Sequence, residues 1–393
     1  MDPFSSTSHA ARPARTAAPR SASAAPLARP ITPEERAGVL AWLDAALRDG
    51  EPGRLAVEYP LSLSRSNLAG HRVAFEGDRP VAHAMFHVVR VRLAGQELPV
   101  GLIGLVYTDP SRRGQGFARS AVEACVAELR RRSVPVAALW AENPSLYTAI
   151  GFAPAGREFH YSLAADVCAR AHSASLAGAD AAGLKVDVAR ARDWSILEAL
   201  YSRKASRAVR ARGALRRLAR APHTRVMVAR RRNRAIAYTA IGRGLDFPGV
   251  VHEWAGGEAG VLACLDQLAR EHGSIGFRSG PLAEAPVPRL LEMGAPVRPG
   301  CFAFLKVLDP VAIWQLLVAG EPTRAAPLLE ESPAGTKLHA SAGTLTLHGD
   351  EVVALLFGPD RPPRIYDCLD ARERETLAQV LPLPLYLWGF DSI

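Results

Sequence analysis

Apolar residues follow helical and strand spacings in turn along the first 165 residues, and their order predicts a mixed α/β unit. A helix should open at Thr32, because Thr32, Pro33 and Glu35 form a capping-box sequence with proline at the first helical position. Period-two alternation and short apolar runs predict strands at 71–76, 80–92, 98–108, 136–140 and 158–163. A long amphipathic helix is expected from Gly116, and a short helix is expected to end at Ile150.

The same order of patterns recurs from residue 185. It predicts a helix over 194–209, strands over 225–229, 235–242 and 250–255, and a helix over 258–271. Local sequence echoes support the match, since residues 72–75 resemble residues 225–228 in shape and position. The sequence therefore predicts two tandem α/β domains with one plan.

The remainder of the chain predicts a small third unit of α+β type. A helix should follow Asp309, strands are expected at 344–347 and 351–357, and a last helix should be capped by Asp370 with Glu373. The final stretch carries aromatic residues between prolines and a glycine. It is too apolar to be left in water, so we expect it to dock on the rest of the protein.

Length and composition agree with several soluble domains. A chain of 393 residues exceeds one ordinary hydrophobic core, and 48% apolar with 22% charged residues is typical of a globular protein. The expected segments are a disordered tail at 1–26, a first domain at 27–166, a linker at 167–184, a second domain at 185–308 and a small third domain with its docking tail at 309–393. The five cysteines form no Cys-x-x-Cys pair, so we expect reduced core thiols and no metal site.

Charge and hydropathy limit the classes of partner that the sequence allows. No apolar run approaches the roughly 18 residues of a membrane span, and residues 1–30 lack a signal-peptide core, so we expect a cytoplasmic protein without membrane contact. The net charge of +9 raises nucleic acid as a partner. However, the densest basic run, 230–234, falls where a hairpin turn would place it in solvent, and no aromatic residues interleave it. The sequence therefore argues against a nucleic-acid partner.

The most specific signal is the segment 108–118, which stands directly after an apolar strand and directly before an amphipathic helix. Gly114 and Gly116 allow close backbone approach and expose successive N–H groups, and the helix start adds about half a positive charge. Arg113 adds a fixed cation. Together these features predict a loop that binds pyrophosphate.

At this point the chain resembles the GNAT (Gcn5-related N-acetyltransferase) superfamily. Arg113, Gly116 and Ala118 fill its signature of Arg or Gln, two residues, Gly, one residue, then Gly or Ala. The resemblance continues through Asn143 and Tyr147 to a Gly-Phe pair, and its specific part covers residues 71 to 163.

The resemblance implies acetyl-CoA as co-substrate, with no metal. It implies that the backbone before the loop pairs with the pantetheine arm and that the loop amides hold the pyrophosphate. Thr108 stands where the family usually has valine. The coenzyme-binding residues expected on this basis are Val106, Tyr107, Thr108, Arg113, Gly114, Gln115, Gly116, Phe117, Ala118, Glu142 and Asn143.

The whole plan resembles the enhanced intracellular survival type of acetyltransferase, in which two GNAT domains precede a sterol-carrier-like domain. The third unit here is short for that domain. The second copy departs from the coenzyme motif, because residues 251–258 contain no arginine and carry Glu258 where an anion would sit. We therefore expect a second domain that is degenerate as a coenzyme site.

The resemblance also implies catalytic roles. It places the hydroxyl of Tyr147 near the coenzyme sulfur, where it would act as general acid. In the resembled enzymes, and in the similarly duplicated N-myristoyltransferases, the terminal carboxylate enters the active site, so Ile393 is the expected base. A tail that merely covers the core stays an open alternative. The fallback bases are Glu142, His83, His87 and Asp109.

The function expected from these features is acetyl transfer from acetyl-CoA to a primary amine by direct attack on the thioester. A catalytically silent acyl-CoA-binding or scaffold protein is the alternative, and an arginine-rich nucleic-acid binder is the third hypothesis. The acceptor, a small molecule or a protein lysine, stays open, with aminoglycosides and polyamines among the candidates. Oligomeric state, including a homo-oligomer, is equally open.

Overall fold

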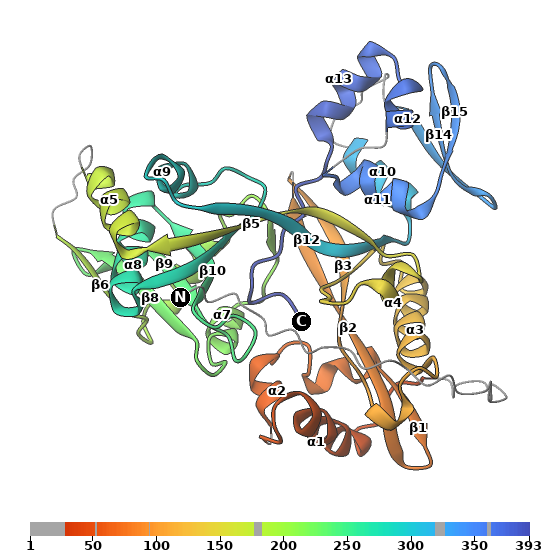
Figure 1. Cartoon of the computed structure of the whole chain (residues 1–393), viewed down its shortest axis with the longest axis horizontal. Helices are drawn as coiled ribbons and strands as arrows, with labels where there is room; N and C mark the ends of the chain where they lie inside the picture. Colours follow the sequence, from red (N-terminus) through yellow and green to blue (C-terminus); the bar gives the residue numbers. More distant parts are fainter. Residues whose placement is uncertain (1–27, 52, 94, 177–182, 319–326, 360–362) are drawn as a thin grey trace, which may run out of the picture.

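A computed structural model describes residues 28–393, apart from 52, 94, 177–182, 319–326 and 360–362 (Figure 1). The tail predicted at 1–26 lies outside the described residues. Within the described part, no helix is both long and apolar enough to cross a membrane.

The first domain has the predicted order of elements. Thr32 and Glu35 form the predicted capping box, with the Thr32 N–H donating to the Glu35 carboxylate at 2.9 Å. The helices are α1 (Glu35–Leu47), α2 (Arg54–Glu58), α3 (Phe117–Arg131) and α4 (Ser145–Thr148). The strands are β1 (His71–Glu76), β2 (Arg79–Leu93), β3 (Gln96–Thr108), β4 (Val136–Leu139) and β5 (Ala153–Ala164). The helix α3 buries its predicted apolar face, including Val122, Cys125 and Leu129.

The second domain repeats this order. Its helices are α6 (Trp194–Tyr201), α7 (Ala214–Leu218), α8 (Glu258–His272) and α9 (Val287–Glu292). Its strands are β6 (Leu184–Val188), β7 (Arg207–Ala208), β8 (Arg225–Arg231), β9 (Arg234–Ile241), β10 (Val250–Gly256), β11 (Ser274–Ser279) and β12 (Val297–Val307). In the first domain, α3 connects two parallel neighbouring strands, β3 and β4. In the second domain, α8 connects the parallel neighbours β10 and β11 in the same way.

The two domains share one sheet because they exchange their last strands. Among the described residues the order is β1-β2-β3-β4-β12-β5-β11-β10-β9-β8-β6, with β7 paired to β2. The last strand of the second domain, β12, therefore pairs with β4, and the last strand of the first domain, β5, pairs with β11. Figure 1 shows β5 and β12 running side by side between the two halves. The tandem domains are consequently one continuous structure.

Several predicted elements of the second domain need correction. The helix predicted over 194–209 ends at Tyr201, because Arg207 and Ala208 pair with β2 of the first domain. The basic run 230–234 is only partly in solvent: Arg230 is buried and pairs with Asp193 at 2.8 Å. A tertiary ion pair and an interdomain strand cannot be read from local pattern.

The segment predicted as a linker, 167–184, contains most of an ordered helix. This helix, α5 (Ala165–Leu176), packs on α8 and buries Val167, Cys168 and Ala171. Cys125 and Cys264 are buried free thiols as well, whereas Cys301 is exposed and Cys368 is half-buried, so not all five cysteines are core residues. The exact domain boundaries stay predictions.

The third unit packs a small sheet against helices. It contains α10 (Pro310–Val318), β13 (Leu328–Ser332), β14 (Gly335–Ala340), β15 (Gly343–Leu347), α11 (Gly349–Phe357), α12 (Pro363–Asp367) and α13 (Ala371–Val380). The strand predicted at 351–357 is wrong, because this segment belongs to α11, which opens with a capping box of His348 and Glu351. A short apolar run buried on several sides has no diagnostic period. The predicted cap of Asp370 with Glu373 on α13 is present.

The final segment, 381–393, leaves the third unit and returns to the middle of the molecule (Figure 1). Tyr386, Trp388 and Phe390 are buried there, which is the docking that their apolar character predicts. The tail thereby reaches the surfaces of both GNAT-like domains.

Candidate active site

The conformation of the predicted phosphate loop is fixed by hydrogen bonds within the loop and by two glycines. The Asp109 carboxylate accepts hydrogen bonds from the Ser111 N–H at 2.9 Å and the Ser111 hydroxyl at 2.6 Å, which fixes the turn after β3. Gly114 and Gly116 then adopt φ values of 74° and 84°. This left-handed region is costly for residues with a Cβ, so these two positions require glycine. The loop delivers the chain to the first turn of α3.

A cavity of about 510 Å³ lies at this loop. Its lining consists of Val106, Tyr107, Thr108, Arg112, Arg113, Gly114, Gly116, Phe117, Ala118, Arg119, Leu146 and Tyr147. Eight of the eleven predicted coenzyme residues are therefore gathered in one cavity, together with the predicted acid. The volume suits a small-molecule or cofactor site.

Three predicted coenzyme residues do not line this cavity. The Gln115 side chain donates to the Ser111 carbonyl at 3.4 Å, and the Asn143 side chain accepts from the Ser145 N–H at 3.2 Å. Glu142 lines a different cavity, described below. Asn143 thus organises the start of α4.

The arginines around the loop differ in their availability. Arg112 pairs with Glu76 at 2.6 Å, and Arg119 pairs with Glu123 at 2.9 Å. Arg113 has no ion-pair partner among the described residues of the chain. It is therefore the loop cation best able to accept an anionic ligand.

Asp109, a fallback base, is committed to the loop. Its hydrogen bonds from Ser111 and the neighbouring Arg79 guanidinium hold the pKa of its carboxyl below the ordinary value. A carboxylate held in its charged form by such bonds is a poor proton acceptor. Asp109 acts as a structural residue of the turn.

His83, one of the two histidines proposed as fallback bases, supports a bulge in β3. Leu105 has a φ of 49°, and the pairing of β2 with β3 shifts register there. The imidazole of His83 contacts the Leu105 carbonyl at 2.7 Å through Nδ1 and His71 at 3.0 Å through Nε2. Burial lowers the pKa of His83 to about 4, and it also lowers the pKa of half-buried His87. His83 is therefore neutral with both ring nitrogens engaged.

Tyr147 projects from α4 into the coenzyme-loop cavity. Its ring packs edge-on against Phe152, with centroids 6.4 Å apart, and burial raises the pKa of its hydroxyl. The end of α4 is fixed from the second domain, because the Lys306 ammonium of β12 donates to the Ile150 carbonyl. Strand exchange thus supports the helix that carries the predicted acid.

A second cavity, of about 660 Å³, lies between the two domains and the tail. Its lining carries three side-chain carboxylates (Glu142, Glu158 and Asp246) and the terminal residue Ile393. Arg278 pairs with Glu158 and Arg48 pairs with Asp246, which leaves Glu142 and the chain terminus as the excess negative charge. The protein is basic overall, yet this cavity is acidic. An acidic cavity attracts cationic ligands.

Glu158 is the centre of a polar cluster in this acidic cavity. Its carboxylate accepts from Arg278 at 2.9 Å and from Tyr386 at 3.4 Å, and it contacts His160 Nε2 at 2.6 Å. Sequence analysis missed this cluster. The only available signal was a Glu-x-His spacing in β5, which places both side chains on one face of a strand.

The terminal residue lies beside β3. Ile393 lines the acidic cavity, and its carboxyl carbon lies so close to Gly104 that a methyl group there would be 2.8 Å from it. Gly104 immediately precedes the bulge at Leu105, and Val106 follows as the first residue of the coenzyme-loop cavity. Of the two predicted catalytic groups, Tyr147 thus shares a cavity with Val106, and Ile393 lies against Gly104, two residues earlier in β3.

The equivalent loop of the second domain carries an acidic side chain at its helix start. Glu258, the first residue of α8, pairs with Arg289 at 3.1 Å. This ion pair lies at the first residue of α8, whereas the first residue of α3 in the first domain is the uncharged Phe117, which follows Gly116. A carboxylate at that position disfavours a pyrophosphate.

Residues 28–155 match the family described as the acetyltransferase (GNAT) domain. This part of the chain is a GNAT domain. It makes the protein an acyltransferase whose co-substrate is an acyl-CoA. Among curated proteins, none matches the chain.

Solved structures share the fold over nearly the whole length. A GCN5-related N-acetyltransferase from Anabaena variabilis superimposes with a TM-score of 0.66 at 14% identity, covering 93% of this chain and 99% of that chain. A GCN5-related N-acetyltransferase from Kribbella flavida gives 0.63 at 16% identity, with 93% and 99% covered. Eis1 from Mycobacterium abscessus gives 0.62 at 16% identity, with 93% and 100% covered. The tandem arrangement and the third unit are therefore features of a shared fold.

Proposed function

We propose that this protein transfers the acetyl group of acetyl-CoA to a primary amine by direct attack on the thioester. The observation that carries the proposal is the position of Ile393, which lines the acidic cavity and lies against Gly104 of β3, the strand whose residues Val106–Thr108 line the loop cavity. The loop cavity offers an anionic coenzyme its glycine N–H groups and Arg113, which has no ion-pair partner in the described part of the chain. The acidic cavity offers carboxylates to a cationic acceptor.

The chemistry requires two proton movements. An alkylammonium with a pKa of about 10.4 is neutral in roughly one molecule in 2,500 at pH 7, so a base accelerates the reaction. In our proposal the terminal carboxylate of Ile393 takes the amine proton while the nitrogen forms a bond to the acetyl carbon. As the carbon–sulfur bond breaks, Tyr147 donates its hydroxyl proton to the departing thiolate.

Tyr147 fits the role of acid for a physical reason. Burial raises the pKa of its hydroxyl, so the group stays protonated at neutral pH. It also lies in the same cavity as Val106 and Thr108, the strand residues proposed to pair with the pantetheine arm.

The acidic cavity favours a small cationic amine as the acceptor. Its volume of about 660 Å³ lies within the range of small-molecule sites, and a polyamine or aminosugar carries the charge that its carboxylates attract. An exposed protein lysine would have to enter between the two domains and the tail.

Thiol release from acetyl-CoA, followed over a panel of amines, tests this proposal. We expect turnover with di- and polyamines and little with neutral or anionic amines of similar size. Changing Glu142 to Gln should raise KM for the cationic amine and leave the affinity for acetyl-CoA unchanged. Coenzyme binding without turnover on any amine would instead identify a silent acyl-CoA-binding protein.

A further inference from the structure

The tail lies beside β10 of the second domain, the strand that corresponds to β3, which precedes the coenzyme loop in the first domain. Strand β10 pairs with β11 only at Val250 and Val251, so the rest of that edge can accept another partner. Strand β3 likewise pairs with β4 only over residues 100–102. The Gly389 N–H donates to the His252 carbonyl of β10 at 3.2 Å, and Trp388 packs edge-on against Trp254 with centroids 5.2 Å apart. Between Trp254 and Trp388 the cavity left is only about 10 Å³, whereas the acidic cavity borders the tail at His252 and Gly389. The tail therefore occupies part of the second cleft.

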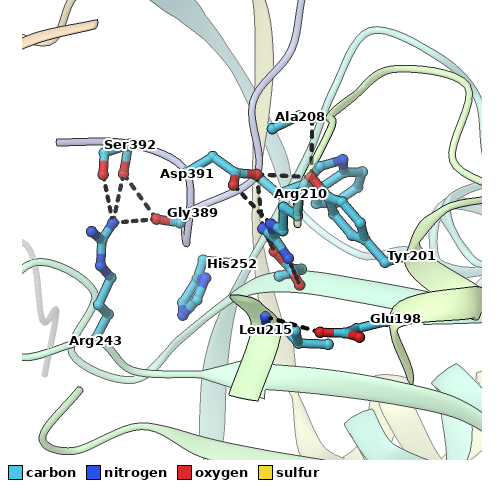
Figure 2. A network of polar contacts seen from close by, with 12 residues as sticks. Glu198, Tyr201, Ala208, Arg210, Leu215, Arg243, His252, Gly389, Asp391 and Ser392 are labelled. Carbon is cyan, nitrogen blue, oxygen red and sulfur yellow. Dashed lines mark hydrogen bonds and ion pairs between the residues drawn. The ribbon is translucent and has the colours of Figure 1, made fainter. Parts of the chain in front are cut away.

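Two arginines of the second domain hold the last residues of this tail (Figure 2). Arg210 pairs with Asp391 at 2.8 Å and also with Glu253. Arg243 donates to the Gly389 carbonyl and to the Ser392 carbonyl at 2.9 Å. Figure 2 shows the two guanidinium groups on opposite sides of the tail. Together they fix the chain up to the residue before the terminus.

Arg243 differs from Arg210 in its charge balance. It is 1% exposed, its other hydrogen bonds go to the Ser392 hydroxyl at 3.0 Å and the Glu58 carbonyl at 3.4 Å, and its guanidinium lies over the Tyr59 ring, 4.5 Å from the centroid. All of its hydrogen bonds therefore go to neutral oxygens, and its Nε has no partner among the described residues. A buried guanidinium is costly without a carboxylate. Asp391 is already paired with Arg210, so the terminal carboxylate, on the residue after Ser392, is the other negative charge that the tail brings to this region.

We propose that Arg243 is a positioning residue for acetyl transfer: it fixes the turn at residues 389–392 so that the Ile393 carboxylate stands against Gly104 at the bulge of β3. The degenerate domain thus uses its vacated cleft to seat the tail and supplies the cation that fixes the tail's end. This inference rests on the proposed function, in which the terminal carboxylate is the base that takes the amine proton.

The test compares Arg243→Ala with wild type in amine-dependent thiol release and in acetyl-CoA titration. We expect kcat to fall at least tenfold, with the Kd for acetyl-CoA within twofold of wild type, because Arg243 does not line the coenzyme-loop cavity. Millimolar guanidinium chloride should restore part of the lost kcat by occupying the space of the missing side chain. Arg225→Ala, which removes an exposed ion pair with Glu271, is the matched control and should show neither loss nor rescue.

A kcat equal to that of wild type, or a loss that guanidinium does not restore, would overturn the inference. Should Arg243→Ala fail to fold, Arg243→Lys decides the matter, because it keeps the charge but cannot reach every acceptor at once. We then expect a folded protein with reduced kcat and unchanged acetyl-CoA affinity, and an unchanged kcat would refute the role. Absence of any turnover in wild type would instead refute the proposed function, so the two failures are distinguishable.

Discussion

The carboxyl group of Ile393 lies against the α-carbon of Gly104, leaving no room for a side chain: a Cβ at Gly104 would be 2.8 Å from the carboxyl carbon and 2.8 Å from its oxygen. The last residue of the chain thus meets the strand that leads into the coenzyme loop. The contact joins a tail seated in the second domain to the GNAT domain. It gives the terminal carboxylate a defined place next to the bulge at Leu105.

Changing Gly104 to Ala should displace this carboxylate. Gly104 does not have a left-handed backbone, so the added methyl acts by contact rather than by backbone strain. We expect kcat to fall at least tenfold while acetyl-CoA affinity is retained, measured by thiol release and calorimetry. Gly257→Ala is the control, because a Cβ there meets nothing within 4 Å. Equal activity of both variants would argue against a catalytic terminus.

Tyr147→Phe should remove the general acid and keep the packing of the ring on Phe152. Loss of a general acid typically costs 10²- to 10⁴-fold, so we expect kcat to fall by about 10²-fold or more. Because burial raises the pKa of Tyr147 above its ordinary value, wild type should not lose activity through this group as pH rises from 7 to 9. A basic limb below pH 9 that disappears in Tyr147→Phe would contradict this assignment.

Arg210→Met should destabilise the whole protein. It would leave Glu253 and Asp391 buried without their cation, and such losses cost about 3–5 kcal/mol. Denaturant unfolding measures the change. Arg225→Met removes the exposed pair with Glu271 and should cost at most about 1 kcal/mol. Similar costs for the two variants would show that the buried cluster does not stabilise the fold.

His83 should make stability fall in acid. Its pKa is about 4 in the folded protein and about 6.5 when unfolded, so the unfolded chain binds a proton first as pH drops. The stabilisation is complete above pH 6.5 and is lost as pH falls toward 4. His83→Gln should flatten the stability profile between pH 6 and 4.5 by up to about 1.4 kcal/mol per pH unit. An unchanged slope in His83→Gln would contradict the assignment.

Much of the fold could be predicted because local signals agree with tertiary structure in the first domain. The capping box at Thr32 and the amphipathic pattern after Gly116 each correspond to an observed helix. The tandem plan and the GNAT domain are confirmed by the shared fold and the family match. The second domain was harder, because strand β7 and the end of α6 depend on pairing with β2.

The coenzyme-loop residues could be proposed from sequence because they are contiguous. The acidic cavity could not, because Glu142, Glu158 and Asp246 come from distant segments that meet only through strand exchange and the docked tail. The exchange itself has no local signal, since β5 and β12 read as ordinary strands whichever partner they choose. Arg243 is one arginine among many until its burial under the tail is known.

Calorimetric titration of acetyl-CoA into wild type, Gly116→Glu and Gly116→Ala tests the proposed site most directly. Both substitutions place a side chain at the same φ of 84°, with nothing within 4 Å of the new Cβ, so they share any backbone strain and differ by a carboxylate at the loop. We predict a single binding event per chain that Gly116→Glu abolishes and Gly116→Ala largely retains. Binding that survives in Gly116→Glu, or no binding to wild type, would contradict a coenzyme site at residues 106–118.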